Sequence, residues 1–221
     1  MSWDPVWEKV FRERTAWGKY PPEEVVRFIA RSYYDVTDRS KVKVLELGCG
    51  PGAGTAWFIA REGYSYSGID GSAVAIEKTR ERFAADGLTG ELLVGDITDL
   101  PWPAETFDCV VDIACLTCNT EIETREILNE VHRVLKSDGR HFSLTFKDGC
   151  WGDGDGRRLD ASTWTEIAEG PFAGLGKTRF SSRHGLERLY AGFRDLDLDY
   201  VVRSVHGGQH EIAQWLVSCR K

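Results

Sequence analysis

A glycine-rich segment follows a short apolar run near residue 44, and its residue types suit close contact with a ligand. The run Val44-Leu-Glu-Leu leads directly into Gly48-Cys-Gly-Pro-Gly-Ala-Gly. Glycine has no Cβ atom, so the backbone at these positions can adopt positive φ angles and approach a bound molecule closely. Open α/β sheets bind ligands beyond the carboxyl ends of their strands. If 43–47 is a strand, the segment lies where a nucleotide-containing ligand would bind.

The acid two residues before the first glycine separates two interpretations of this loop. The spacing of Gly48, Gly50 and Ala53 also satisfies the dinucleotide fingerprint of nicotinamide enzymes. The Glu46 carboxylate would repel a pyrophosphate, but it would attract a cofactor that carries an ammonium group. The loop therefore favours a cationic cofactor, and a nicotinamide-dependent oxidoreductase is the alternative.

Further acids follow the same pattern along the chain. Asp70 closes the second apolar run, Asp96 follows the third and Asp112 lies near the end of the fourth. A carboxylate after the second strand can accept hydrogen bonds from two ribose hydroxyls, which nicotinamide enzymes also exploit. The position of Asp70 therefore indicates a nucleoside, but it does not choose between the two cofactors.

Taken together, these segments resemble the class I S-adenosylmethionine-dependent methyltransferases, in particular the type 11 methyltransferase domain. Glu46 and the three glycines match the family's first motif, an acid followed by G-x-G-x-G. The stretch 101–112 resembles the family's approach to strand four, and 133–139 resembles its turn before strand five, with Ser137-Asp138 in place of Pro-Gly. The resemblance covers about residues 40 to 146.

The resemblance implies S-adenosyl-L-methionine as cofactor and S-adenosyl-L-homocysteine as product. It also implies binding residues in the glycine loop, after strand two, after strand three and at the end of strand four. These are Glu46, Gly48, Cys49, Gly50, Gly52, Asp70, Gly71, Ser72, Asp96, Ile97, Asp112 and Ile113. Trp17, in an aromatic leader that precedes the first strand, is expected to lie over the cofactor as part of a lid.

Acceptor-binding candidates lie in the segments that should flank the cofactor. They are Tyr20, Thr117, Cys118, Asn119 and Trp151. The aromatic residues of the leader suit an aromatic or amphipathic acceptor and suit a plain core equally well. Methyl transfer from a sulfonium needs proximity above all, so no obligatory catalytic triad is expected. If a base is needed, the candidates are His184, His206 and His210, although a lone histidine is more often a surface residue.

The charge and composition of the chain restrict the kinds of molecule that it is expected to bind. The 221 residues carry a formal net charge of −7, whereas surfaces that bind nucleic acid are normally basic. No N-P-P-Y or D-P-P-Y signature follows 107–113, which also favours a small-molecule acceptor over nucleic acid. No run approaches the roughly 18 apolar residues of a membrane span, and 1–9 has no targeting character. The default expectation is a cytoplasmic monomer or homodimer.

The cysteine pair at 115 and 118 has the C-x-x-C spacing but lacks the second pair of ligands that a zinc site requires. No metal is therefore expected. Buried or pocket-lining thiols are the leading interpretation of this pair, and a redox or metal role is the alternative.

Strand-like and helix-like segments alternate between about 42 and 146, which is typical of βαβ units around a parallel sheet. We predict an α/β, Rossmann-like fold with a seven-stranded, mostly parallel sheet, an antiparallel last strand and helices on both faces. The expected strands are 43–47, 64–70, 91–94, 107–113, 141–146, 196–205 and 211–219. The last two are joined by only a few residues, so they must be antiparallel.

Local signals also place helices and divide the chain. Ser72 should cap a helix that ends at Gly87, and Thr120 with Glu123 forms the pattern of a capping box. Residues 1–40 are expected to form a helical lid or leader of the same domain. Residues 41–221 are expected to form the methyltransferase domain, with an irregular insert at about 150–182. A third hypothesis is a methyltransferase-like module that holds the cofactor without turnover.

Overall fold

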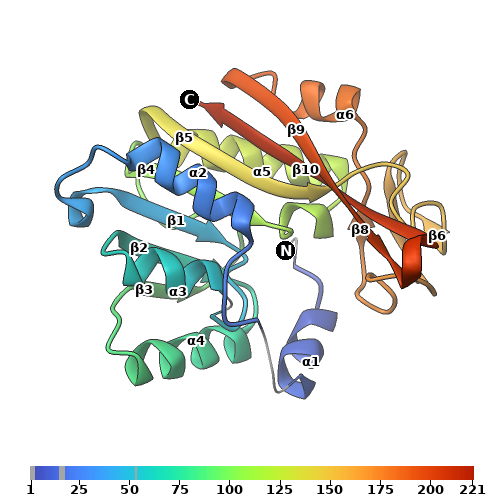
Figure 1. Ribbon diagram of the computed structural model, residues 1–221, viewed down its shortest axis with the longest axis horizontal. Helices are drawn as coiled ribbons and strands as arrows, with labels where there is room; N and C mark the ends of the chain where they lie inside the picture. The colour runs from blue at the N-terminus through green and yellow to red at the C-terminus, as the bar shows by residue number, and fades with distance from the viewer. Residues whose placement is uncertain (1–2, 15–17, 53) are drawn as a thin grey trace.

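A seven-stranded sheet forms the centre of the computed structural model, which describes residues 3–14, 18–52 and 54–221 (Figure 1). The strand order is β3-β2-β1-β4-β5-β10-β9. The first five strands in the chain are parallel, and β10 is antiparallel to both of its neighbours. The strands are β1 (Lys43–Leu47), β2 (Ser65–Asp70), β3 (Glu91–Val94), β4 (Phe107–Ile113), β5 (Leu135–Phe146), β9 (Arg194–Val205) and β10 (His210–Arg220). The predicted fold class, including the antiparallel last strand, is confirmed.

Helices cover both faces of this sheet. They are α1 (Val6–Glu13), α2 (Glu23–Tyr33), α3 (Gly54–Arg61), α4 (Ala73–Ala85), α5 (Glu121–Val134) and α6 (Arg183–Leu189). Short 3-10 turns are η1 (Arg39–Lys41), η2 (Leu116–Cys118) and η3 (His206–Gly208). Successive residues of a strand point to opposite faces, so Val110 packs with α5 and α6 while Val111 packs with α2, α3 and α4.

The predicted helix caps form as local chemistry requires. Thr120 Oγ1 accepts the Glu123 amide, and the Glu123 carboxylate accepts the Thr120 amide, which completes the capping box of α5. Ser72 Oγ accepts the Ala75 amide at the start of α4. Each bond satisfies an amide that the first helical turn would otherwise leave unpaired. Both helices therefore begin at the carboxyl edge of the sheet, where a ligand is expected.

Two segments differ from the prediction. Strand β5 begins at Leu135 instead of 141, because Leu135 pairs with Phe107 and Arg140 with Cys109 of β4, while residues 136–139 have no paired residue in β4 at this register shift. The insert expected to be irregular contains a small antiparallel sheet of β6 (Arg157–Arg158), β7 (Thr163–Thr165) and β8 (Thr178–Arg179). Strands of two or three residues are too short for a periodic signal. The insert has its own apolar cluster, which includes Phe172 and Phe180, against the β5–β10 pair.

Candidate functional site

A cavity of about 380 Å³ opens where β1, β2 and β4 end. Its floor is the glycine loop, and its walls come from η2, from the turn after β3 and from the N-terminal leader. The lining residues are Trp3, Asp4, Trp7, Phe11, Gly18, Tyr20, Pro22, Glu46, Gly48, Cys49, Gly50, Pro51, Gly54, Thr55, Asp70, Gly71, Gly95, Ile97, Ile113, Ala114, Cys115, Cys118 and Asn119. A cavity of this size, with apolar walls and a few convergent polar groups, is typical of a small-ligand site.

The glycine loop is shaped by backbone conformations that only glycine adopts without strain. Gly48 and Gly50 both have φ near +58°. A Cβ atom on Gly48 would also lie 2.6 Å from Cys115 Cβ, so this glycine allows the loop to pack against the end of β4. The Gly50 amide donates to Asp70 Oδ2 at 2.9 Å, which joins the ends of β1 and β2. This hydrogen bond joins the loop to one of its two flanking acids.

Glu46 is the most unusual polar group in the cavity. Its side chain is 4% exposed, and Tyr66 donates a hydrogen bond to Oε2 at 2.8 Å. Burial raises its pKa to about 8, against the lowering effect of the Tyr66 hydrogen bond. In the part of the chain that the structure describes, no Lys or Arg forms an ion pair with it. The site therefore holds a buried carboxylate that a cationic ligand group would complement.

Asp70 is held by the backbone around it. Its two oxygens accept the amides of Gly50 and Ser72, and burial nevertheless raises its pKa to about 6. The Ser72 hydroxyl in turn donates to the Glu8 carboxylate of α1 at 2.5 Å. The same turn thus orients the predicted ribose-binding acid and anchors the leader.

The leader crosses the cavity and closes one side of it. Trp3, Trp7 and Phe11 line the cavity, and the Trp3 ring lies against Gly71, where a Cβ atom would approach it within 2.5–2.7 Å. Lys78 of α4 donates to the carbonyl of Phe11, which fixes the end of α1. The sequence places these three residues in the aromatic leader before the first strand, but it does not predict that they line the site. Their only signal there was the concentration of aromatic side chains before the first strand.

The cavity brings together most of the predicted binding residues. Those that line it are Glu46, Gly48, Cys49, Gly50, Asp70, Gly71, Ile97, Ile113, Tyr20, Cys118 and Asn119. Predicted residues that do not line it are Gly52, Ser72, Asp96, Asp112, Thr117 and Trp151. Trp17 lies outside the described residues.

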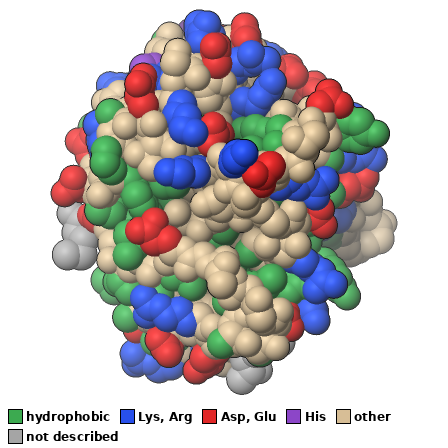
Figure 2. All heavy atoms as spheres, turned by 90° about the vertical axis from the view of Figure 1, so that its left-hand side faces the viewer, with side chains coloured by type: hydrophobic (Ala, Val, Ile, Leu, Met, Phe, Trp, Pro, Cys, Tyr) green, Lys and Arg blue, Asp and Glu red, His purple; other side chains and the backbone are tan. Residues whose placement is uncertain are grey.

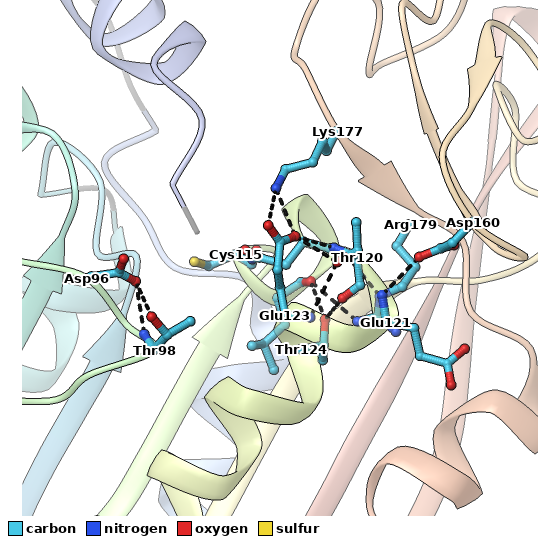
Figure 3. A network of polar contacts seen from close by, with 12 residues as sticks. Asp96, Thr98, Cys115, Thr120, Glu121, Glu123, Thr124, Asp160, Lys177 and Arg179 are labelled. Carbon is cyan, nitrogen blue, oxygen red and sulfur yellow. Dashed lines mark hydrogen bonds and ion pairs between the residues drawn. The ribbon is translucent and has the colours of Figure 1, made fainter. Parts of the chain in front are cut away.

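The predicted residues beyond the lining have other contacts. A Cβ atom on Gly52 would meet Thr79 of α4 at 3.1–3.3 Å. The Asp112 carboxylate is fully buried and accepts the amides of Cys115 and Leu116 and the Ser143 hydroxyl. Asp112 therefore shapes the turn into η2, and its backbone neighbours face the cavity. Asp96 accepts the amide and hydroxyl of Thr98, which Figure 3 shows at the turn after β3.

The three candidate bases lie away from the cavity. His184 is exposed on α6, 3.7 Å from Glu187. His206 and His210 belong to the β9–β10 connection, where Trp151 stacks on His210 with ring centroids 4.0 Å apart. Trp151 thus packs with the hairpin and not with the acceptor candidates of η2.

Thiols form part of the cavity wall. Burial raises the pKa of Cys118 to about 12 and that of Cys115 well above its usual value, so both are protonated and weakly reactive. Within the described ranges, no cluster of His, Cys, Asp and Glu has the arrangement of a metal site. These observations support pocket-lining thiols as the interpretation of the C-x-x-C pair.

The insert supports the wall of the cavity through a polar network at the start of α5 (Figure 3). Lys177 pairs with both oxygens of Glu123 at 2.7 and 2.8 Å, and Asp160 accepts the Glu121 amide at 3.0 Å. The buried Arg179 donates to the carbonyls of Leu116 and Asn119, both at 3.3 Å. The position of η2 therefore depends on a segment some 60 residues further along the chain.

The fold is a Rossmann-like α/β domain, and the cavity lies at the carboxyl ends of its parallel strands. Residues 44–139 match the family model described as a methyltransferase domain. Over these residues, which are less than half of the chain, the sequence is thus similar to a methyltransferase domain.

Curated relatives align with only part of the chain. A fatty-acid O-methyltransferase from Mycolicibacterium smegmatis is 32% identical over 122 residues, which are 53% of this chain and 43% of the relative. A phthiotriol/phenolphthiotriol dimycocerosates methyltransferase from Mycobacterium leprae is 29% identical over 160 residues, 68% of this chain and 57% of the relative. The chain thus spans about half the length of the curated relatives it matches.

Solved structures share the fold over nearly the whole chain. A SAM-dependent methyltransferase from Methanosarcina mazei has a TM-score of 0.67 at 22% identity and covers 87% of this chain and 96% of its own. The 4+2 cyclase SpnF has a TM-score of 0.66 at 18% identity, covering 98% and 93%. Likeness at this identity shows the fold alone, and the cyclase indicates that the fold does not by itself specify a reaction. None of the helices in the described ranges combines the length and apolar character of a membrane span.

Proposed function

We propose that this protein transfers a methyl group from S-adenosyl-L-methionine to a small-molecule acceptor and releases S-adenosyl-L-homocysteine. The observation that carries the proposal is the buried Glu46 carboxylate, which lies beside the glycine loop and has no basic partner among the residues that the structure describes. The cofactor, when bound, supplies an activated methyl group on a sulfonium. Glu46 would accept hydrogen bonds from its ammonium group, and Asp70 from its ribose hydroxyls. Asp96 and Ile97 would recognise its adenine.

The protein's own contribution is to position the acceptor and exclude water. No His, Lys or Arg is among the described residues that line the cavity, and its thiols are held protonated by burial. The residues present therefore favour in-line displacement by an acceptor that is already nucleophilic, with proximity as the main source of rate enhancement.

The lining also restricts the charge of the acceptor. Beside the acids expected to hold the cofactor, Asp4 faces the cavity together with Trp3, Trp7 and Phe11. A carboxylate anion such as a fatty acid would find no described cation among the lining residues. A neutral or cationic acceptor with an apolar body would complement these side chains, since aromatic faces and a carboxylate both attract cations.

A small molecule is a better acceptor than nucleic acid on electrostatic grounds. No His, Lys or Arg is among the described residues that line the cavity, and on the opposite face, at the amino ends of the parallel strands, Lys and Arg side chains are interspersed with Asp and Glu (Figure 2). The net charge of the whole chain is −7. A nucleic-acid-binding face would need a concentrated basic region.

Calorimetric titration tests the proposal. We expect S-adenosylmethionine and S-adenosylhomocysteine to bind with micromolar affinity, and NADH and NADPH not to bind. Glu46→Gln and Asp70→Asn should each weaken binding about tenfold or more, through lost charge-assisted hydrogen bonds. Glu77→Gln, an exposed change on α4, is the matched control. Binding of a nicotinamide cofactor instead would establish the oxidoreductase alternative.

A second candidate function is a cofactor-holding module that performs another reaction or none. The observation that favours this second candidate is the structural likeness to the 4+2 cyclase SpnF. It predicts tight binding of S-adenosylhomocysteine with no methyl transfer to any neutral or cationic acceptor in a radiolabelled screen. Transfer to a single such acceptor would exclude it.

A further inference from the structure

The outer edge of β9 is an exposed strand edge. β9 is the last strand in the sheet order and pairs with β10 alone among the described segments (Figure 1). Tyr200 and Val202, two apolar side chains on the same face of this strand, are 56% and 43% exposed. An edge strand has free backbone donors and acceptors that readily pair with another strand. Arg183 of α6 donates to the carbonyl of Leu198. Beyond that residue, the open edge with its exposed apolar side chains is of a kind that proteins normally cover.

Three charged residues of β9 flank Val201, which lies in the second half of the strand. Asp197 and Asp199 precede Val201, and Arg203 follows it. None of these three charged side chains forms an ion pair with the residues that the structure describes. Alternation along a strand places all four residues on the same face.

This pattern is complementary to itself when the strand is inverted. In an antiparallel pair with its two-fold axis at Val201, Asp199 lies opposite Arg203 of the other copy, and Tyr200 lies opposite Val202. Each pair occurs twice, and Asp197 lies diagonal to the same arginine. Opposite charges and aromatic–β-branched pairs both stabilise directly opposed positions. An axis at Asp199 would instead oppose two aspartates. An axis at Tyr200 would oppose Asp197 to Arg203 but would place Tyr200 against itself, so the charged pair and the aromatic–β-branched pair together favour the axis at Val201.

We propose that β9 pairs with β9 of a second copy of this chain, forming a symmetric homodimer with a continuous sheet across the interface. The contact is isologous, the commonest arrangement of homo-oligomers. The interface lies at the end of the sheet order, and no β9 residue lines the cavity. Dimerisation therefore does not depend on the proposed methyl transfer.

The test measures the dimer dissociation constant by sedimentation and by light scattering across a concentration series. We expect a dimer for the natural sequence. Arg203→Asp should raise the dissociation constant about tenfold or more, because an aspartate at 203 would then face Asp199 of the other copy on both sides of the two-fold axis. Asp199→Arg should act likewise, and the double variant Asp199→Arg/Arg203→Asp should restore the dimer. Arg31→Asp, the same charge change at an exposed position of α2, is the control. Circular dichroism confirms that each variant is folded.

The register is tested with a cysteine on the axis. Directly opposed strand residues have Cα atoms about 4.5–5.5 Å apart, a separation that a disulfide spans. Val201→Cys should therefore form a covalent dimer on mild oxidation, whereas Ser204→Cys, which faces Leu198 of the other copy, should not. A monomer at every concentration would overturn the proposal. A dimer unaffected by Arg203→Asp, or equal cross-linking of both cysteine variants, would also overturn it.

Discussion

Glu46 should couple cofactor binding to proton release. Burial raises the pKa of Glu46 to about 8, so the free protein carries a proton there at pH 7. An ammonium group would bind the ionised carboxylate, and binding below pH 8 should release close to one proton. Affinity should accordingly fall as the pH falls, approaching tenfold per pH unit well below the pKa. Titration of S-adenosylhomocysteine in buffers of different ionisation enthalpy counts the released protons.

The Glu46→Gln variant provides the control for this linkage. It keeps a polar side chain of similar shape but cannot titrate, so its binding should be weak and release no proton. Measurements between pH 7 and 8 limit interference from Asp70, whose pKa is about 6. The same proton count in both proteins would mean that another group is responsible.

At the scale of elements, residues 18–22 form a strap along the cavity, and the position of this strap should depend on one glycine. A Cβ atom on Gly54 would overlap the backbone of Tyr20 and Pro21, and the Gly54 amide donates to the Gly18 carbonyl at 3.2 Å. Gly54→Ala should displace the strap that closes the cavity. We expect about tenfold weaker binding of S-adenosylhomocysteine, equivalent to roughly 1.4 kcal/mol, and faster tryptic cleavage after Lys19.

Gly192→Ala is the matched control for this displacement, since Gly192 has open space around its would-be Cβ atom. It should leave both binding and proteolysis unchanged. If Gly54→Ala bound the ligand normally, the strap would have no part in closing the cavity.

Elements with local chemical signals were predictable from the sequence, whereas those formed by distant contacts were not. The capping box of Thr120 and Glu123 specifies the start of α5 within four residues. The early start of β5 at Leu135 depends on a distant partner, since Leu135 pairs with Phe107 of β4 ahead of a register shift. Similarly, the sequence alone indicates Glu46, because it is an acid two residues before the first glycine of the loop. The path of the N-terminal leader is not predictable in this way, since it depends on the contact between Glu8 and Ser72, which are 64 residues apart.

At the scale of the whole molecule, the carboxylates of the site should make the free protein less stable in alkaline solution. Burial raises the pKa of Glu46 to about 8 and those of Asp70 and Asp112 to about 6. The unfolded chain loses these protons first, so stability is lost as the pH rises through this window. Between pH 6.5 and 8.5, Glu46 alone should cost roughly 2 kcal/mol.

The opposing titration of His141 lies outside this interval. Burial lowers the pKa of His141 to about 4, so its contribution is lost only as the pH falls below about 6.5. Urea unfolding at pH 6.5 and 8.5 should therefore show the loss in the natural protein and a smaller loss in Glu46→Gln. Equal losses in the two proteins would assign the pH dependence to other groups.

Bound cofactor should offset this trend, because the charge that destabilises the free fold is the charge that the ligand needs. A ligand that binds only the folded state stabilises it by about 2.7 kcal/mol at one hundred times its dissociation constant. Since the affinity rises as Glu46 ionises, a fixed concentration of S-adenosylhomocysteine should raise the unfolding free energy more at pH 8.5 than at pH 6.5. Glu46→Gln should show the same small increment at both values. An increment that is larger at pH 6.5 would separate the buried carboxylate from cofactor binding and contradict its role in the site.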